Sequence, residues 1–290
     1  MTEKRRDRLP KGANETQTKR QRKAAAAAAK PSYHKSKPSI PHSDTPLDEL
    51  LPHQRIDLIA DLSEAVLEDP TSAVSSSRTT IAEQSDEQNQ QYQKSQSKLQ
   101  TLLNLASPYT NGHDGHAARL SILSLLAIFQ DILPSYRIRL PTESEMSVRV
   151  SKEIKATWDY ERKLLMYYQR YLQLLEKTWD SGKWGNNLGG KQDRGGSPTT
   201  LAATAILSMS QLLITCYNFN FRSNILQLVV WQGNNRSSEE IRMSCCNALS
   251  AMFEKDVQGE ASLEAVRRIA KMLKEGSKGK KGVHPDLLNT

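Results

Sequence analysis

Apolar residues recur every three or four positions over most of the chain, which is the spacing of one face of an α-helix. The first such pattern lies before Pro70 and predicts an amphipathic helix that ends near this proline; it consists of Leu58, Ile59, Leu62, Val66 and Leu67. A second pattern starts at Leu99. Residues 117–133 are apolar on nearly every side, which predicts a helix that is buried between neighbours.

The next helix has a clear start. Thr142 and Glu145 fit a capping box that follows Pro141. A heptad stripe follows, in which successive residues are alternately four and three positions apart and Glu161 is the one polar member. It consists of Ile154, Trp158, Glu161, Leu165, Tyr168, Leu172, Leu175 and Trp179. Unbroken from 142 to 180, this helix would be about 58 Å long. A coiled coil is one reading of the stripe; because it is rich in aromatic residues, we favour a single long helix along a stack of others.

Four more helical patterns follow, over residues 198–217, 223–232, 238–254 and 262–275. The apolar face predicted for the last of them is Leu263, Val266, Ile269 and Leu273. We find no segment with the period-2 pattern of a strand. The sequence therefore predicts an all-α fold, a HEAT/armadillo-like helical-repeat solenoid with a long central helix, although no strict sequence repeat is visible.

Composition suggests five regions. Residues 1–46 read as a disordered basic tail, and residues 47–180 as an N-terminal helical domain with a disordered Ser/Gln-rich insertion at 71–97. Residues 181–197 are a Gly-rich linker. A helical-repeat segment at 198–276 and a basic tail at 277–290 complete the predicted organisation.

The net charge of +8 is unevenly placed. Residues 1–37 hold twelve Lys or Arg and three Asp or Glu, a balance of +9, so the other 253 residues sum to −1. Within the tail, Lys19, Arg20, Arg22 and Lys23 form a cluster typical of nuclear import, of nucleic-acid contact, or of an ordinary solvated tail.

Two further basic features lie in the predicted folded part. After the buried helix, "PSYRIRLP" alternates Tyr136 and Ile138 with Arg137 and Arg139, so an extended arm would present two apolar groups on one side and two cations on the other. The last helix carries Arg267, Arg268, Lys271 and Lys274. The six cations of the arm and the last helix are candidate contacts to RNA or to a protein partner. The alternative for the arm is a well-packed connection between helices, and the alternative for the last helix is a solvated face. Few aromatic residues accompany the basic runs, so any nucleic-acid contact would be to phosphates.

No pattern in the sequence supports an enzyme. "GNNLGGKQ" (Gly185–Gln192) resembles a phosphate-binding loop but has Gln192 where the magnesium-binding Ser or Thr belongs, and no strand precedes it. "HDGH" and three cysteines without C-x-x-C spacing make a poor metal site. We expect no catalytic residue, metal, cofactor or small-molecule substrate, and no membrane span or secretory leader.

Several stretches together resemble the nucleolar complex-associated protein 3 family: "RIDLIADLSEAVLEDP", "DILPSYRIRLPTESE", "YYQRYLQLLE", "FNFRSNILQLVV" and "MSCCNALSAMFEKDVQGEASLEAV". The resemblance implies a nuclear and nucleolar protein without enzymatic activity. It would act in assembling the large (60S) ribosomal subunit, with nucleolar complex-associated protein 2 and pre-ribosomal particles with their pre-rRNA as partners. The alternative that it implies is a chromatin-binding factor in the initiation of DNA replication, with origin factors as partners.

The family also extends beyond the point that corresponds to "VHPDLLNT", into a C-terminal domain shared among nucleolar complex proteins. We therefore expect a truncated form in which the segment beyond about Gly233 is poorly covered. The sequence leaves open whether the stripe at 154–179 pairs with another chain, and which RNA region is bound.

Overall fold

The computed structural model describes residues 47–75, 96–107, 114–184, 200–276 and 282–290, which all belong to one compact unit, Ser43–Thr290. Every regular element among these residues is a helix, which confirms the predicted all-α class. In chain order they are η1 (Leu47–Glu49), α2 (Pro52–Glu68), α3 (Pro70–Ala73), α4 (Lys98–Ala106), α5 (Gly115–Ile132), α6 (Glu143–Ser147), α7 (Lys152–Trp184), α8 (Leu201–Cys216), α9 (Arg222–Gly233), α10 (Glu239–Lys255), α11 (Glu260–Gly276) and α12 (Pro285–Leu288).

Side-chain caps fix where several of these helices begin. Ser97, Thr200 and Ser238 each accept a hydrogen bond from a backbone N–H in the first turn of α4, α8 and α10. The carboxylate of Asp114 caps α5 through the amides of His116 and Ala117, and it also pairs with the buried Arg55 of α2 at 3.4 Å. This one acid therefore starts α5 and ties it to its neighbour.

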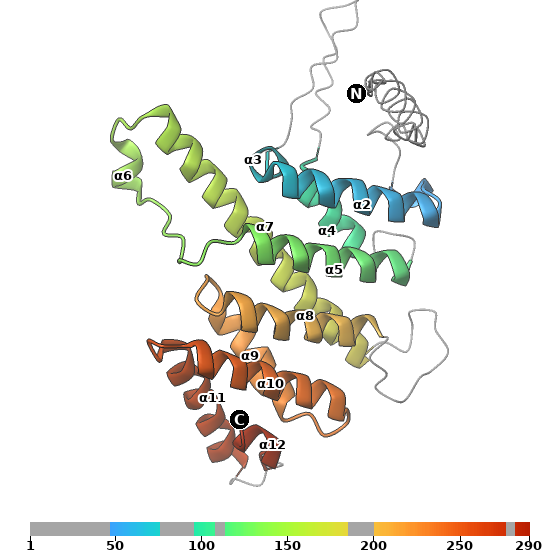
Figure 1. Cartoon of the computed structure of the whole chain (residues 1–290), viewed down its shortest axis with the longest axis vertical. Coiled ribbons are helices and arrows are strands. Elements are labelled where there is room, and N and C mark those ends of the chain that lie inside the picture. Colours follow the sequence, from blue (N-terminus) through green and yellow to red (C-terminus); the bar gives the residue numbers. More distant parts are fainter. Residues whose placement is uncertain (1–46, 76–95, 108–113, 185–199, 277–281) are drawn as a thin grey trace, which may run out of the picture. The chain divides into compact units, whose positions relative to one another are not determined.

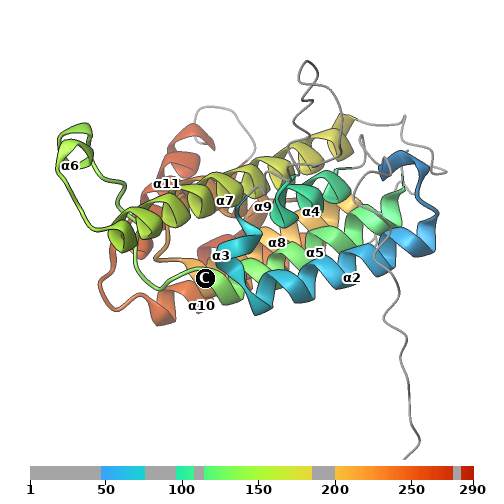
Figure 2. The ribbon, with the colours of Figure 1, turned by 90° about the horizontal axis from the view of Figure 1, so that it is seen from above.

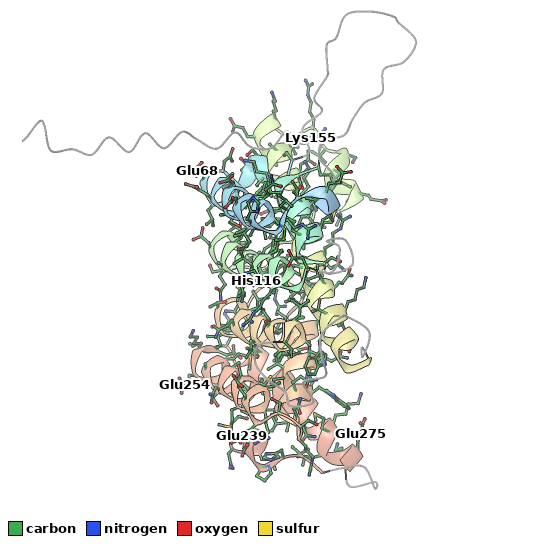
Figure 3. The ribbon with its side chains drawn as sticks, turned by 90° about the vertical axis from the view of Figure 1, so that its right-hand side faces the viewer. Glu68, His116, Lys155, Glu239, Glu254 and Glu275 are labelled. Atoms are coloured by element: carbon green, nitrogen blue, oxygen red, sulfur yellow. The ribbon has the colours of Figure 1, made fainter. Side chains whose placement is uncertain are left out.

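The helices are stacked in layers (Figures 1 and 3). One series of contacts runs from α2 to α5, from α5 to α8 and from α8 to α10. The helices α4, α7, α9 and α11 lie beside this series: α4 contacts α2 and α5, α7 contacts α4 and α8, α9 contacts α8 and α10, and α11 contacts α9 and α10. Each helix thus covers an apolar face that its neighbour could not bury alone.

The predicted continuous helix from 142 to 180 is wrong, because it is divided into α6 and α7. Figure 2 shows α6 turned away from the line of α7. The capping box of Thr142 and Glu145 is present at the start of α6, as predicted. The sequence "SVRVS" then interrupts the helix: two β-branched valines disfavour helix, and Ser151 caps α7 through the amide of Ile154 at 3.3 Å.

The heptad stripe of α7 is buried within its own fold over its second half. Leu165, Tyr168, Leu172 and Leu175 are buried, whereas Ile154 near the start of the helix is exposed. The favoured reading, a helix lying along a stack, therefore holds for residues 165–179. The first turns of α7 extend beyond the layers (Figure 2).

Aromatic rings fill the core where α7 meets α5 and α8. The ring of Phe129 on α5 lies 5.2 Å from that of Tyr171 and 5.3 Å from that of Tyr168, both on α7. Tyr168 in turn contacts Phe219, which lies between α8 and α9, at 5.4 Å between ring centres. All four rings are fully buried or nearly so, which makes this cluster the centre of the core.

Four sequence expectations need correction. The core face of α11 contains Ala261, Ala265 and Ile269, whereas the predicted Leu263, Val266 and Leu273 are about half exposed. The segment predicted as a basic tail contains α12, in which Leu287 is buried.

The interval predicted as an insertion, 71–97, includes most of α3 and the buried residues Ala73, Val74 and Ser97. The first four residues of the linker predicted at 181–197 belong to α7. The rest of this linker, the predicted tail at 1–46 and the centre of the insertion lie outside the described residues.

The two buried tyrosines of α7 allow a matched test of the core. The hydroxyl of Tyr171 donates to the carbonyl oxygen of Ile122 at 2.9 Å, whereas that of Tyr168 has no hydrogen-bond partner among the described residues. Burial raises the pKa of both phenols, so both stay neutral. We expect Tyr171→Phe to lower the free energy of unfolding by about 1 kcal/mol and Tyr168→Phe to leave it equal or higher. Urea denaturation followed by circular dichroism measures both; equal losses would contradict the assignment.

Candidate functional site

The arm between Pro134 and Pro141 joins the end of α5 to the start of α6 without regular structure. Asn220, from the turn between α8 and α9, holds it in place. The side-chain oxygen of Asn220 accepts a hydrogen bond from the amide of Ile138 at 2.9 Å, and its side-chain nitrogen donates to the carbonyl oxygen of the same residue at 3.0 Å. One side chain thus pairs with both backbone groups of Ile138, as a neighbouring strand would.

The apolar pair of the arm divides between the core and solvent. Ile138 is buried, but Tyr136 is 60% exposed, and its hydroxyl donates to Glu161 of α7 at 3.4 Å. Of the two apolar groups predicted to lie on one side of the arm, only Ile138 therefore enters the core.

Both arginines of the arm contact groups within the chain. The guanidinium of Arg137 donates to the carbonyl oxygen of Asn218 at 3.3 Å and lies 3.8 Å from the carboxylate of Glu260. Arg139 pairs with Glu145 of α6 at 2.6 Å. Both side chains are more than half exposed, so these pairs position the arm and contribute little stability.

The Arg137–Glu260 pair leads into an ion network on the inner side of α11. Arg222, at the start of α9, lies 3.8 Å from Glu260 and donates to Glu264 at 3.2 Å. Glu264 also accepts from Arg268 at 3.0 Å and from the hydroxyl of Ser223 at 2.5 Å. The structure therefore brings two of the predicted cations, Arg137 and Arg268, into one network, although they are far apart in the sequence.

The network sets the charge state of Glu264. Partial burial raises the pKa of this carboxyl, but hydrogen bonds from Ser223, Arg268 and Arg222 outweigh burial, and the net pKa is lowered from its ordinary value of 4.5. Glu264 is thus ionised at neutral pH and offsets the charge of the nearly buried Arg222.

The other predicted cations of α11 point away from this network. Arg267, Lys271 and Lys274 are exposed, so they form a basic surface on the outside of the helix. Arg268 is half-buried and belongs to the inner side. The predicted set of four is therefore split between two sides of one helix.

Most of the other sequence motifs lie outside the described residues. Lys19, Arg20, Arg22 and Lys23, as well as "GNNLGGKQ" and His113, lie outside the described residues. His116 lies in the first turn of α5 (Figure 3), and no group of three or more His, Cys, Asp or Glu among the described residues could hold a metal ion. Of the described helices, none has the length and apolarity to cross a bilayer.

Part of the chain is similar to a known family. A family model described as nucleolar complex-associated protein matches residues 54–171. The nucleolar complex protein 3 homologues of Homo sapiens and Mus musculus are 35% and 34% identical over 177 residues, which is 59% of this chain and 21% of each relative. Over residues 54–171 the chain is similar to the NOC3p family. The nucleolar complex-associated protein 3 of Schizosaccharomyces pombe is 32% identical over 157 residues, 54% of this chain and 20% of the relative. The chain thus spans about a fifth of the length of the curated relatives that it matches.

Three of the residues that organise this site are not among those predicted from the sequence. Asn220 is one polar residue in a turn, and its partner Ile138 is 82 positions away. Arg222 and Glu264 lie on different helices, so their pairing depends on how α9 and α11 pack. Only the residue type of Arg222 gives a hint, since it stands at the start of a helix, where a cation is unfavourable without a partner.

The clamp by Asn220 can be tested by hydrogen exchange. Asn220→Ala removes two hydrogen bonds worth about 1 kcal/mol each, so the amide of Ile138 should exchange about tenfold to thirtyfold faster. Asn218→Ala, in the same turn, keeps the carbonyl that Arg137 uses and should leave exchange unchanged. Hydrogen-exchange mass spectrometry of a peptide covering 134–141 makes the comparison. Equal protection in both variants would show that the clamp is not what holds the arm.

Acid should weaken the α9–α11 contact through Glu264. Because the folded-state pKa of Glu264 is below its ordinary value, its stabilising contribution is complete above about pH 4.5 and is lost as the pH falls through the folded-state value. Urea midpoints of the wild type and Glu264→Gln should therefore differ at pH 7 and converge as the pH falls through the folded-state pKa. Glu254→Gln, an exposed change on α10, serves as the control, with no such convergence expected. A difference for Glu264→Gln that persists at low pH would contradict the role of its charge.

Proposed function

We propose that this chain is a non-enzymatic nucleolar assembly factor for the large ribosomal subunit. Similarity to the NOC3p family over residues 54–171, together with relatives whose names place them in nucleolar complexes, is the observation that carries the proposal. The chain would act by holding partners together rather than by chemistry.

The layered helices suit a scaffold. The contacts from α2 through α5 and α8 to α10, with a second helix beside each, support the proposal of a HEAT/armadillo-like solenoid. Such stacks keep their inner faces for the core and present the outer faces of successive helices to partners. The proposed partners are nucleolar complex-associated protein 2 and pre-ribosomal particles with their pre-rRNA.

The basic tail would bring the chain to the nucleus and the nucleolus. Lys19, Arg20, Arg22 and Lys23 form its densest cluster, and residues 1–37 carry an excess of nine positive charges over a nearly neutral remainder. A positive segment of this kind attracts phosphates through a salt-dependent interaction that is independent of sequence.

Among the other candidate contacts, we assign the partner surface to α11 rather than to the arm. Arg137 and Arg139 are engaged by Asn218, Glu260 and Glu145, so a partner would have to replace these contacts. Arg267 and Lys271 are exposed and form no ion pair with any described residue.

Sedimentation of the tagged chain from cell extract tests the proposal. We expect the wild type to migrate with large-subunit precursors and their pre-rRNA. Arg267→Gln/Lys271→Gln should shift at least about a third of the protein to free fractions, since two charge contacts are worth roughly 0.4–2 kcal/mol together. Arg137→Gln/Arg139→Gln, which removes the same charge from the arm, should leave migration unchanged.

Nuclease treatment separates the ribosomal role from the chromatin role. Release of the chain from the nuclear pellet by RNase supports the proposal. Retention after RNase with release by DNase would favour chromatin binding in the initiation of replication. If the chain sedimented only as free protein, without ribosomal RNA precursors, the assembly role would be abandoned.

A further inference from the structure

Helix α11 has two apolar faces, one toward the core and one toward solvent. Its inner side buries Ala261, Ala265 and Ile269 against α9 and α10. Its outer side exposes Leu263, Val266 and Leu273 at 51%, 53% and 44%, respectively. With Ala270 these residues are spaced by three, four and three positions, which places them in one stripe along the outside of the helix. Two leucines and a valine thus face outward, whereas two alanines and Ile269 face the core.

A row of cations borders this stripe on one side. At 3.6 residues per turn, Arg267, Lys271 and Lys274 follow the stripe along the same edge, and all three are exposed. Three acids also lie on α11, and Glu275, which follows Lys274 in the last turn, is half-buried. Glu264 is turned into the inner network, and Glu260 is faced by both Arg137 and Arg222. The outer surface of α11 therefore combines an apolar stripe with a positive edge.

We propose that the outer face of α11 binds an amphipathic helix of a protein partner, whose own apolar stripe is bordered by acidic side chains. Apolar residues at three- and four-residue spacing are the anchors that a helix lying in a groove or along another helix uses. The positive edge selects an acidic border and rejects a basic one. This inference states which kind of partner would bind the α11 surface that is proposed above as the partner surface. It does not depend on the ribosomal role.

Two other occupants fit the surface less well. An RNA backbone would satisfy Arg267 and Lys271 but would leave Leu263, Val266 and Leu273 without a complementary surface, because phosphate contacts are polar. An antiparallel second copy of α11 would set the row of cations against itself, and like charges at that position disfavour pairing.

Fluorescence anisotropy with the whole 290-residue chain and two synthetic peptides tests the inference. Both peptides are labelled helices of about three heptads with Leu in the stripe; one has Glu along the border, and the other has Lys at the same positions. We expect the Glu-bordered peptide to bind at least about tenfold more tightly. A short RNA duplex serves as the competitor and should not displace it.

Two double variants separate the stripe from its edge. Leu263→Ser/Val266→Ser should weaken binding of the Glu-bordered peptide at least about tenfold, whereas Leu123→Ser, an exposed leucine of α5, should not. Arg267→Glu/Lys271→Glu should reverse the preference, so that the Lys-bordered peptide binds more tightly. Because these side chains are exposed, circular dichroism should show unchanged helix content in each variant.

Four results would overturn the inference. The first is that no saturable binding is seen up to about 100 μM peptide, and the second is that Leu263→Ser/Val266→Ser leaves the affinity unchanged. The third is that the RNA duplex displaces the peptide. The fourth is that analytical ultracentrifugation shows a dimer that the same serine variant abolishes. The third result would point to RNA, and the fourth to a second copy. Since the assay contains no ribosomal component, failure of the assembly role would leave its outcome unaffected.

Discussion

The position of the ring of Tyr168 is the constraint on which most of the described architecture depends. Tyr168 lies on the long helix α7 and contacts Phe129 of α5 on one side and Phe219 of the α8–α9 turn on the other. Through these contacts α5, α7 and the α8–α9 turn, which are distant in sequence, meet at one point. The ring thus joins α5 to the turn that follows α8. Each such aromatic pair contributes about 0.5–1.5 kcal/mol beyond the area that it buries.

The turn after α8 has an unusual backbone because it must send Phe219 inward. Phe221 adopts a left-handed conformation with φ of 65°, which costs a bulky residue about 1–3 kcal/mol, and its ring lies 6.3 Å from that of Tyr168. The same turn presents the carbonyl of Asn218 and the side chain of Asn220 to the arm. The aromatic core therefore also fixes the geometry of the turn that holds residues 134–141.

Local signals in the sequence predict most helices, because their causes lie within a few residues. The capping box at Thr142 and the aromatic-rich stripe through Tyr168 both have the roles that their patterns indicate. Sequence reasoning does not find the break at 148–151 because it joins the capping box at Thr142 to the stripe that begins at Ile154, although Val148 and Val150 between them disfavour helix. Of the candidate site residues, the pattern could place Arg267 on a helix, but it could not show that Arg137 meets Glu260, because that pairing needs the tertiary fold.

The rotation of α11 shows why hydrophobicity alone predicted the wrong core face. Turning the helix to bury Leu263 and Val266, each already about half buried, would gain roughly 1–1.5 kcal/mol per side chain. The same rotation would carry Glu264 away from Arg222, whose side chain is only 9% exposed. Breaking a buried pair by removing one partner costs about 3–5 kcal/mol, so the ion pair outweighs the two apolar side chains. The outward stripe is therefore a consequence of the inner network: the contacts that seat α11 on α9 are the ones that leave its larger apolar residues available to a partner.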